Sequence, residues 1–331
     1  MMEFNEQEFN DLYDKELRDV QEQLDNEILF VLIGDVNAGK SSTVNQIMEE
    51  DVASVGAQPG ETTAIKKYVY KEKIAFVDTP GLDDINRENS AETLKYYKEA
   101  DVILFFLNAA GTVLSEGEKK SLQEVRKTNK EILLVLNKID AADDIPELVQ
   151  YIKTNTGNEF KVIPISSRTG ENMQQLRDAI LDILQTKKKD LLFAKELKAK
   201  SAVANRWILA TAASAGVVGA VPLPGADIVP LTGLQVGMMV RLATLYDKPI
   251  SKQRARELAI ATFTGNIGKS IFRQAVKVVP GAGAAIGGGV AASMTLALGY
   301  GIKYTYENNI ELNVEFLKNF ADNFKDKDQE R

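Results

Sequence analysis

The sequence predicts an α/β fold with a mainly parallel six-stranded sheet, followed by an all-α second domain. Between residues 28 and 186, short runs of Val, Ile, Leu and Phe alternate with amphipathic segments, which is the pattern of a doubly wound sheet with helices on both faces. Beyond the basic run at 187–189 this strand signal stops and helical patterns follow. A chain of 331 residues is long for one core, so we expect two domains.

Each predicted element corresponds to one of these runs. The strands are expected at 28–33, 64–70, 73–77, 101–107, 131–136 and 160–165, and the helices of the sheet domain at 40–49, 91–99, 116–129, 145–155 and 171–186. The second strand is expected to run antiparallel. In the second half, helices are predicted over 191–220 and over 232–246. Sheets of this kind bind ligands at the carboxyl ends of their strands.

The first segment of the chain, residues 1–26, is acidic and has the pattern of an amphipathic helix. Its apolar side chains recur at helical spacing, at Phe9, Leu12, Tyr13, Leu17, Val20 and Leu24. A complete sheet domain leaves this stripe without a partner, so we expect it to pack on the helical domain. The predicted domains are therefore the helix 1–26, the sheet domain 27–186 and the helical domain 187–331.

A glycine-rich loop joins the first predicted strand to the first helix of the sheet domain. The octapeptide G-D-V-N-A-G-K-S, from Gly34 to Ser41, directly follows the apolar run 28–33. Its glycines let backbone N–H groups approach a polyanion, which also faces the positive end of the following helix. The pattern predicts a site for a nucleoside triphosphate but does not name the base.

Two further polar turns follow predicted strands. D-T-P-G, from Asp78 to Gly81, ends the strand at 73–77, and N-K-I-D, from Asn137 to Asp140, ends the strand at 131–136. An aspartate at a strand end can hold Mg²⁺ through its water shell, and a glycine N–H can meet a terminal phosphate. The amide and carboxylate of the second turn can pair with the N7/O6 edge and the N1/N2 donors of guanine. Adenine lacks those donors, so we expect a guanine nucleotide.

With these three motifs, residues 28–186 resemble the Ras-like P-loop GTP-binding domains of the Era and TrmE branch. The resemblance implies GTP and GDP as ligands and Mg²⁺ as cofactor. It implies that Thr63, in the switch-like segment P-G-E-T-T-A at 59–64, completes the metal shell. The implied nucleotide ligands are Asn37, Ala38, Gly39, Lys40, Ser41, Ser42, Asn137, Lys138, Asp140, Ser166 and Ser167, the metal ligands Ser41, Thr63 and Asp78, and the catalytic groups Lys40, Thr63, Gly81 and Asn37.

One departure from the family matters for catalysis. Ras-type enzymes carry a water-positioning glutamine after the D-x-x-G glycine, and this chain has Leu82 there. In the TrmE-like branch a loop asparagine, matched here by Asn37, helps to hold K⁺ against the phosphates, and pairing of two domains completes the site. The resemblance thus implies a slow monomer stimulated by homodimer formation and by K⁺. The alternatives are that Asn37 only shapes the loop, and that the chain binds GTP without hydrolysing it.

Composition excludes several kinds of chemistry and divides the chain by charge. Cysteine and histidine are both absent, which excludes disulfides, cysteine nucleophiles, histidine bases and ordinary zinc sites. No charged-then-apolar secretory segment opens the chain, so a cytoplasmic location is expected. Residues 1–186 are acidic overall and residues 187–331 are basic. The basic half either faces the phosphates of lipid or RNA or docks on the acidic half.

Two nearly charge-free segments rich in Gly, Ala and Val mark the second half, at 207–221 and 278–299. The first has too few apolar residues before Pro222 to span a bilayer. The second contains many glycines, so it forms either a close-packed helical hairpin in a soluble core or a hairpin that inserts in a membrane interface. This half resembles a poorly characterised helical domain found after Era-like GTP-binding domains, with its P-x-P-G-A-D element at 222–227.

Two classes of function follow from these expectations. The first is a GTP-driven protein resembling the immunity-related and dynamin-like GTPases, which self-associates and acts at an anionic membrane surface, peripheral to the inner face of the cell membrane. The flanking amphipathic helix and the glycine-rich hairpin favour this class. The second is an RNA or ribosome assembly switch like Era. No G-x-x-G clamp in a KH-type context and no aromatic-rich basic stretch favours the second class.

Overall fold

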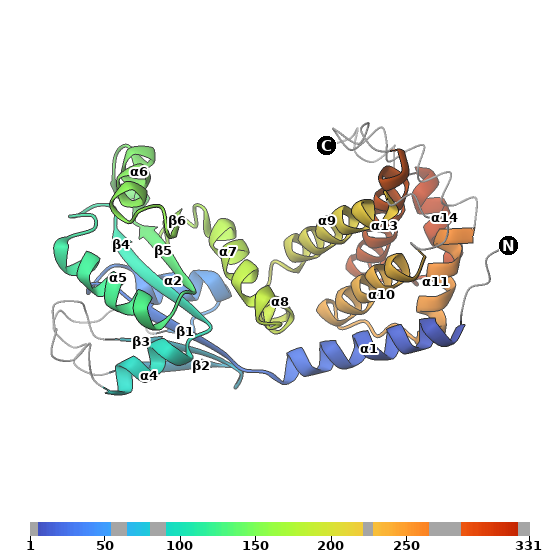
Figure 1. Ribbon diagram of the computed structural model, residues 1–331, viewed down its shortest axis with the longest axis horizontal. Helices are drawn as coiled ribbons and strands as arrows, with labels where there is room; N and C mark the ends of the chain where they lie inside the picture. The colour runs from blue at the N-terminus through green and yellow to red at the C-terminus, as the bar shows by residue number, and fades with distance from the viewer. Residues whose placement is uncertain (1–5, 54–64, 80–90, 221–227, 265–285, 324–331) are drawn as a thin grey trace. The chain divides into compact units, whose positions relative to one another are not determined.

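The structure is a computed structural model that describes residues 6–53, 65–79, 91–220, 228–264 and 286–323. The chain forms two compact units. The sheet unit comprises residues 23–198, and the helical unit comprises residues 1–22 together with 199–331. Figure 1 shows the elements of each unit.

The sheet unit contains the predicted six-stranded, mainly parallel sheet. Its strands are β1 (Ile28–Ile33), β2 (Lys66–Tyr70), β3 (Ile74–Asp78), β4 (Val102–Asn108), β5 (Ile132–Asn137) and β6 (Lys161–Pro164), in the order β2-β3-β1-β4-β5-β6. Only β2 is antiparallel to its neighbour, as expected, because a short turn joins it directly to β3. The predicted α/β fold class is therefore confirmed.

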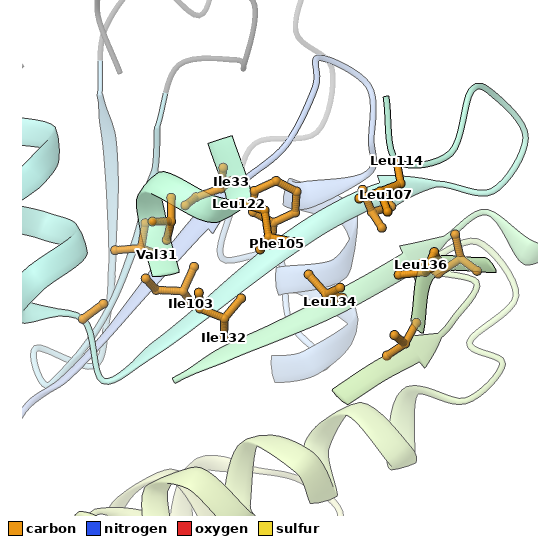
Figure 2. Packing of buried hydrophobic residues seen from close by; sticks show 14 of the residues in the cluster. Val31, Ile33, Ile103, Phe105, Leu107, Leu114, Leu122, Ile132, Leu134 and Leu136 are labelled. Atoms are coloured by element: carbon orange, nitrogen blue, oxygen red, sulfur yellow. The ribbon is translucent and has the colours of Figure 1, made fainter. Parts of the chain in front are cut away.

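Helices cover both faces of this sheet. The helices α4 (Ala91–Glu99), α5 (Glu116–Thr128) and α6 (Ile145–Asn155) pack on one face, against side chains such as Val31, Ile103 and Phe105 (Figure 2). The other face carries Phe30 and Phe76, whose rings stack at 4.8 Å. Because β1, β3, β4 and β5 are apolar on both faces, they read as continuous apolar runs rather than alternating ones.

A buried arginine fixes the first helix of the sheet unit, α2 (Lys40–Met48), at its carboxyl end. Arg177, on α7 (Met173–Thr186), donates from Nη2 to Gln46 O at 2.5 Å and from Nε to Ile47 O at 3.1 Å. The last carbonyls of a helix have no partner within it, and a cation suits their partial negative charge. Arg177 therefore holds in place the helix whose amino end carries Lys40.

The prediction of one long helix over 191–220 is wrong, because the chain forms two helices there. They are α8 (Asp190–Glu196) and α9 (Lys200–Gly219), separated at Leu197, which is extended with φ −74° and ψ 141°. Phe193 of α8 packs on Phe30 of the sheet, with ring centroids 5.5 Å apart. The sheet unit consequently ends after Lys198 rather than at the expected residue 186.

The helical unit packs its helices through small residues. Besides α9 it contains α10 (Ile228–Leu245), α11 (Lys252–Thr264), α13 (Ile286–Glu307) and α14 (Val314–Asn323). A Cβ on Gly299 of α13 would lie 2.8 Å from Ile208 of α9, so the glycine permits close approach of these two helices. Of the predicted hairpin at 278–299, residues 278–285 lie outside the described part of the chain. No helix among the described residues is long and apolar enough to cross a membrane.

The first helix, α1 (Glu6–Asp25), contacts the other helices of this unit. Phe9 and Val20 are buried, and the Tyr13 hydroxyl donates to Ile250 O at 2.6 Å. The prediction that Leu17 belongs to the buried stripe is wrong, because its side chain is 47% exposed. Phe9, Tyr13 and Val20 are buried and form the inner face of the helix, and Leu17 lies at its exposed margin.

The acidic first half and the basic second half neutralise one another at several points. Lys189 pairs with Asp101 at 2.8 Å within the sheet unit. In the helical unit Lys252 pairs with Asp14 at 2.7 Å, and Arg256 pairs with Glu6. These contacts fit the alternative in which the basic half docks on acidic residues of the same chain.

Loss of the Phe9 side chain should destabilise the helical unit. Phe9 is 1% exposed, and truncating a buried phenylalanine to alanine costs about 3 to 5 kcal/mol. Trp207 is the single tryptophan, and it lies buried in this unit, so its fluorescence during urea unfolding reports on the helical unit. We expect Phe9→Ala to lower the unfolding midpoint clearly and Leu17→Ala, on the same helix, to change it little. Equal midpoints for both variants would show that α1 is not part of this core.

Candidate nucleotide-binding site

The loop between β1 and α2 takes backbone conformations that favour glycine. Gly34 has φ 145° and Gly39 has φ 90°. A Cβ on Gly34 would lie 2.8 Å from the carbonyl oxygen of Phe106, and one on Gly39 would overlap the Asn137 amide. The loop thus passes close to the ends of β4 and β5. It brings its backbone to the amino end of α2, where N–H groups face an anion.

Lys40 and Asp78 meet beneath this loop. The Lys40 ammonium is 8% exposed and donates to Gly34 O at 2.7 Å and to Asp35 O at 3.1 Å. Its Nζ lies 3.6 Å from Oδ1 of Asp78, at the end of β3. Burial raises the pKa of the Asp78 carboxyl, and the Lys40 charge opposes that rise.

The Asp78 carboxylate fits a Mg²⁺ ion. Among the described residues its buried Oδ1 has no hydrogen-bond partner, so it keeps acceptor capacity for a hard cation or for the waters around one. Ser41, half-buried in the first turn of α2, would supply a hydroxyl ligand. A metal ion there would neutralise phosphate charge. Thr63, the third expected ligand, lies outside the described residues.

The Asn137 side-chain amide, at the end of β5, hydrogen-bonds both the loop after β1 and the turn after β6. Asn137 is fully buried, and its Nδ2 donates to Ala38 O at 2.8 Å and to Ser167 Oγ at 3.1 Å. The Ser167 N–H donates to Asn137 Oδ1 at 3.0 Å. Asn137 therefore orients the phosphate-binding loop relative to the turn that carries Ser166 and Ser167.

Asp140 lies in the turn after β5. The turn after β6, which carries Ser166 and Arg168, holds its carboxylate in place. The Ser166 hydroxyl donates to its Oδ1 at 2.5 Å, and Arg168 Nη2 lies 2.5 Å from its Oδ2. The hydrogen bond from Ser166, together with the nearby Arg168 charge, lowers the pKa of the Asp140 carboxyl. A carboxylate ionised at neutral pH is the acceptor that paired N–H donors of a purine edge need.

The structure brings most of the predicted site residues to one edge of the sheet. Ala38, Gly39, Lys40, Ser41 and Ser42 lie in the loop and the first turn of α2, Lys138 has a left-handed conformation at φ 65°, and Asn37 is exposed in the loop at φ 66°. Thr63, Gly81 and Leu82 lie outside the described residues. Arg168, the last residue of the turn at 165–168 that was expected to contact guanine, contacts Asp140. Arg177, which had no predicted role, contacts α2. Arg168 directly follows the predicted serines, but no sequence pattern shows its contact.

Comparison with known protein families identifies the sheet unit. Residues 29–138 match the family described as 50S ribosome-binding GTPase, and residues 184–318 match a domain of unknown function. Over these residues the chain has a GTPase domain similar to those of Era and MnmE. The resemblance expected from the three motifs is confirmed for this domain.

Curated relatives of the GTPase domain share only part of their length with this chain. The tRNA modification GTPase MnmE of Thermotoga petrophila is 34% identical over 158 residues, which cover 45% of this chain and 34% of that protein. GTPase Era of Clostridioides difficile is 29% identical over 163 residues, which cover 46% and 54% of the two chains. The crystal structure of Aquifex aeolicus Era bound to GDP and AlF₄⁻ is 26% identical, with a TM-score of 0.39 over 47% of this chain and 56% of that chain. The chain thus spans between a third and about half of these curated relatives.

Proposed function

We propose that this protein binds GTP and GDP with Mg²⁺ and hydrolyses GTP to GDP. The observation that carries the proposal is the ionised Asp140 carboxylate at the same sheet edge as Lys40 and Asp78. Asp140 supplies the acceptor for the guanine N1 and N2 donors, and Lys40 supplies charge for the phosphates. The test is nucleotide binding by the full chain, in which GTP and GDP should compete far better than ATP.

In this proposal, hydrolysis requires a charge-stabilising group that a single GTPase domain does not supply. The Leu82 side chain has no polar atom that can orient water, so charge developing on the leaving oxygen needs another stabiliser. Asn37 is exposed in the phosphate-binding loop, where its side-chain oxygen can face a cation. The proposal is that K⁺ held beside Asn37, together with a second copy of the chain in a GTP-dependent homodimer, supplies this stabilisation.

Potassium should accelerate GTP hydrolysis relative to sodium, and turnover per chain should rise with protein concentration. Both effects follow if a cation beside Asn37 and a second copy complete the site. Initial rates in matched KCl and NaCl buffers measure the first effect, and Asn37→Ala should remove it. Equal rates in both salts, unchanged by Asn37→Ala, would leave this residue only a role in loop shape.

We further propose that the helical unit associates peripherally with an anionic membrane surface on the cytoplasmic side. The support lies on α9, where Leu209 is 54% exposed and Val217 is 74% exposed. Residues 207–219 of this helix contain no charged side chain. An uncharged helix face of this kind can lie in a membrane interface. Several basic side chains of the helical unit are already paired with acidic residues of the same chain. We therefore expect the apolar face of α9 to contribute more to membrane binding than net charge does.

Binding to anionic liposomes should increase with GTP and decrease with salt. Self-association makes weak contacts multivalent, so a dimer binds more firmly than a monomer, and any contribution of basic side chains is screened. Co-sedimentation in each nucleotide state measures this. Leu209→Asp with Val217→Asp should abolish binding, whereas Val69→Asp, at an exposed position of β2, should not. A protein that stays in the supernatant in every state would refute the membrane proposal.

A second candidate is a GTP-dependent RNA or ribosome assembly switch. The names of the matched family and of the MnmE relatives favour it, since they refer to the 50S ribosome and to tRNA modification. The match to MnmE covers only 45% of this chain. The name of that relative therefore gives no support for RNA binding by the helical unit. A salt-dependent shift of ribosomal or transfer RNA in native gels, without liposome binding, would put this candidate ahead.

A further inference from the structure

The guanidinium of Arg168 holds the carboxylate that the proposed function assigns to guanine. Arg168 Nη2 lies 2.5 Å from Asp140 Oδ2, while the Ser166 hydroxyl occupies Oδ1 at 2.5 Å. The Asp140 side chain is 11% exposed and that of Arg168 is 75% exposed. Both oxygens of a largely buried carboxylate are therefore engaged, one of them by a side chain that reaches in from the solvent.

The chemistry of these groups makes Arg168 and guanine alternatives. A guanidinium presents N–H donors on neighbouring nitrogens of one planar carbon, and it matches a carboxylate with two parallel hydrogen bonds. The guanine edge presents N1–H and N2–H on the two sides of one ring carbon in the same way. Asp140 Oδ2 cannot accept both sets of donors at full strength. Arg168 and a guanine base therefore compete for this oxygen.

We propose that Arg168 is a built-in competitor of the guanine base, which lowers the affinity for guanine nucleotides and speeds their release. This inference rests on the proposed guanine-nucleotide binding and adds to that site a residue that sets affinity and release rate. When the base departs, the Arg168 guanidinium compensates the Asp140 charge. A switch protein needs its nucleotide to leave, and an internal partner for Asp140 favours that step.

The backbone around Arg168 keeps the competitor in reach. The Thr169 N–H donates to Ser166 Oγ at 3.1 Å, and the Gly170 N–H donates to Ser166 O at 2.9 Å. These two bonds close one tight turn that contains Arg168, and the Ser166 hydroxyl anchors this turn to Asp140. The Arg168 backbone is thereby held beside the carboxylate, while its exposed side chain is free to swing away.

The first test compares GDP binding by the native chain and by Arg168→Ala. We expect Arg168→Ala to bind GDP about threefold to tenfold more tightly, between the effects of an exposed ion pair and of a charge-assisted hydrogen bond. Most of the change should appear as slower dissociation of a fluorescent GDP analogue. Arg126→Ala, which removes a half-buried arginine of α5 that pairs with Glu159 at 3.8 Å, is the control and should bind like the native protein. Unchanged or weaker GDP binding by Arg168→Ala would overturn the inference.

The second test removes the shared partner. In an Asp140→Asn background, assayed with xanthosine diphosphate, the carboxylate charge is gone, so adding Arg168→Ala should change the affinity by less than about twofold. A tenfold effect in this background would show that Arg168 acts without Asp140 and would overturn the inference. Failure of the native chain to bind any guanine nucleotide would instead refute the proposed function itself.

Discussion

Replacing Asp140 with asparagine should exchange the base that the protein prefers, from guanine to xanthine. The Asp140 carboxylate accepts from the guanine N1 and N2 donors, and each charge-assisted hydrogen bond contributes about 1.5 to 3 kcal/mol. An asparagine amide cannot accept both, so we expect GTP affinity to fall at least about tenfold. Xanthine carries an oxygen in place of the N2 amino group, and the asparagine NH₂ can donate to it. Equilibrium titration with GTP and xanthosine triphosphate measures both changes.

A neighbouring aspartate provides the control for this substitution. Asp143 is exposed and lies in the same loop after β5, so Asp143→Asn changes the net charge equally without touching the base site. It should leave the preference for GTP unchanged. If Asp140→Asn kept the native preference, or if Asp143→Asn altered it to the same degree, the carboxylate of Asp140 would not be the determinant of base selectivity.

Replacing Lys40 with alanine should have the larger effect on affinity. The Lys40 ammonium is almost fully buried between the loop and Asp78, where it would face the phosphates in a water-poor setting. Losing two charge-assisted contacts to phosphate at about 1.5 to 3 kcal/mol each lowers affinity by at least about a hundredfold. Fluorescent GDP titration in excess Mg²⁺ measures the loss.

Folding must be separated from binding in this case. Lys40→Ala leaves the buried Asp78 carboxylate without its cation, so thermal unfolding should accompany the titration. Lys127→Ala, at an exposed lysine of α5, is the matched control and should bind GDP normally. A folded Lys40→Ala protein with native GDP affinity would contradict the assignment of this loop to nucleotide phosphates.

The sheet domain could be predicted because its signals are local. The runs that became β1, β3 and β5 are continuous and apolar, and each ends in a motif whose residues carry the chemistry. Parallel strands bring their carboxyl ends to one edge. The proximity of Asn137 to the loop at Ala38 follows from that rule, although the two residues are far apart in sequence.

The remaining features depend on tertiary contacts that no local pattern contains. The break at Leu197 could not be read from composition, because the run after residue 190 is a good helix former and only the packing of Phe193 on Phe30 shows where the sheet unit ends. Leu17 fitted an apolar stripe by spacing yet is exposed. Arg168 and Arg177 look like ordinary surface arginines in sequence, and their partners lie on other segments.

The most direct test of this account is the equilibrium affinity of the native chain for GDP against ADP, measured with Mg²⁺ in one competition titration. Because Asp140 can pair with the N1 and N2 donors of guanine and adenine has neither, we expect GDP to bind at least about a hundredfold more tightly than ADP, from the loss of two charge-assisted hydrogen bonds. Equal affinity for the two nucleotides, or no binding of either, would contradict it.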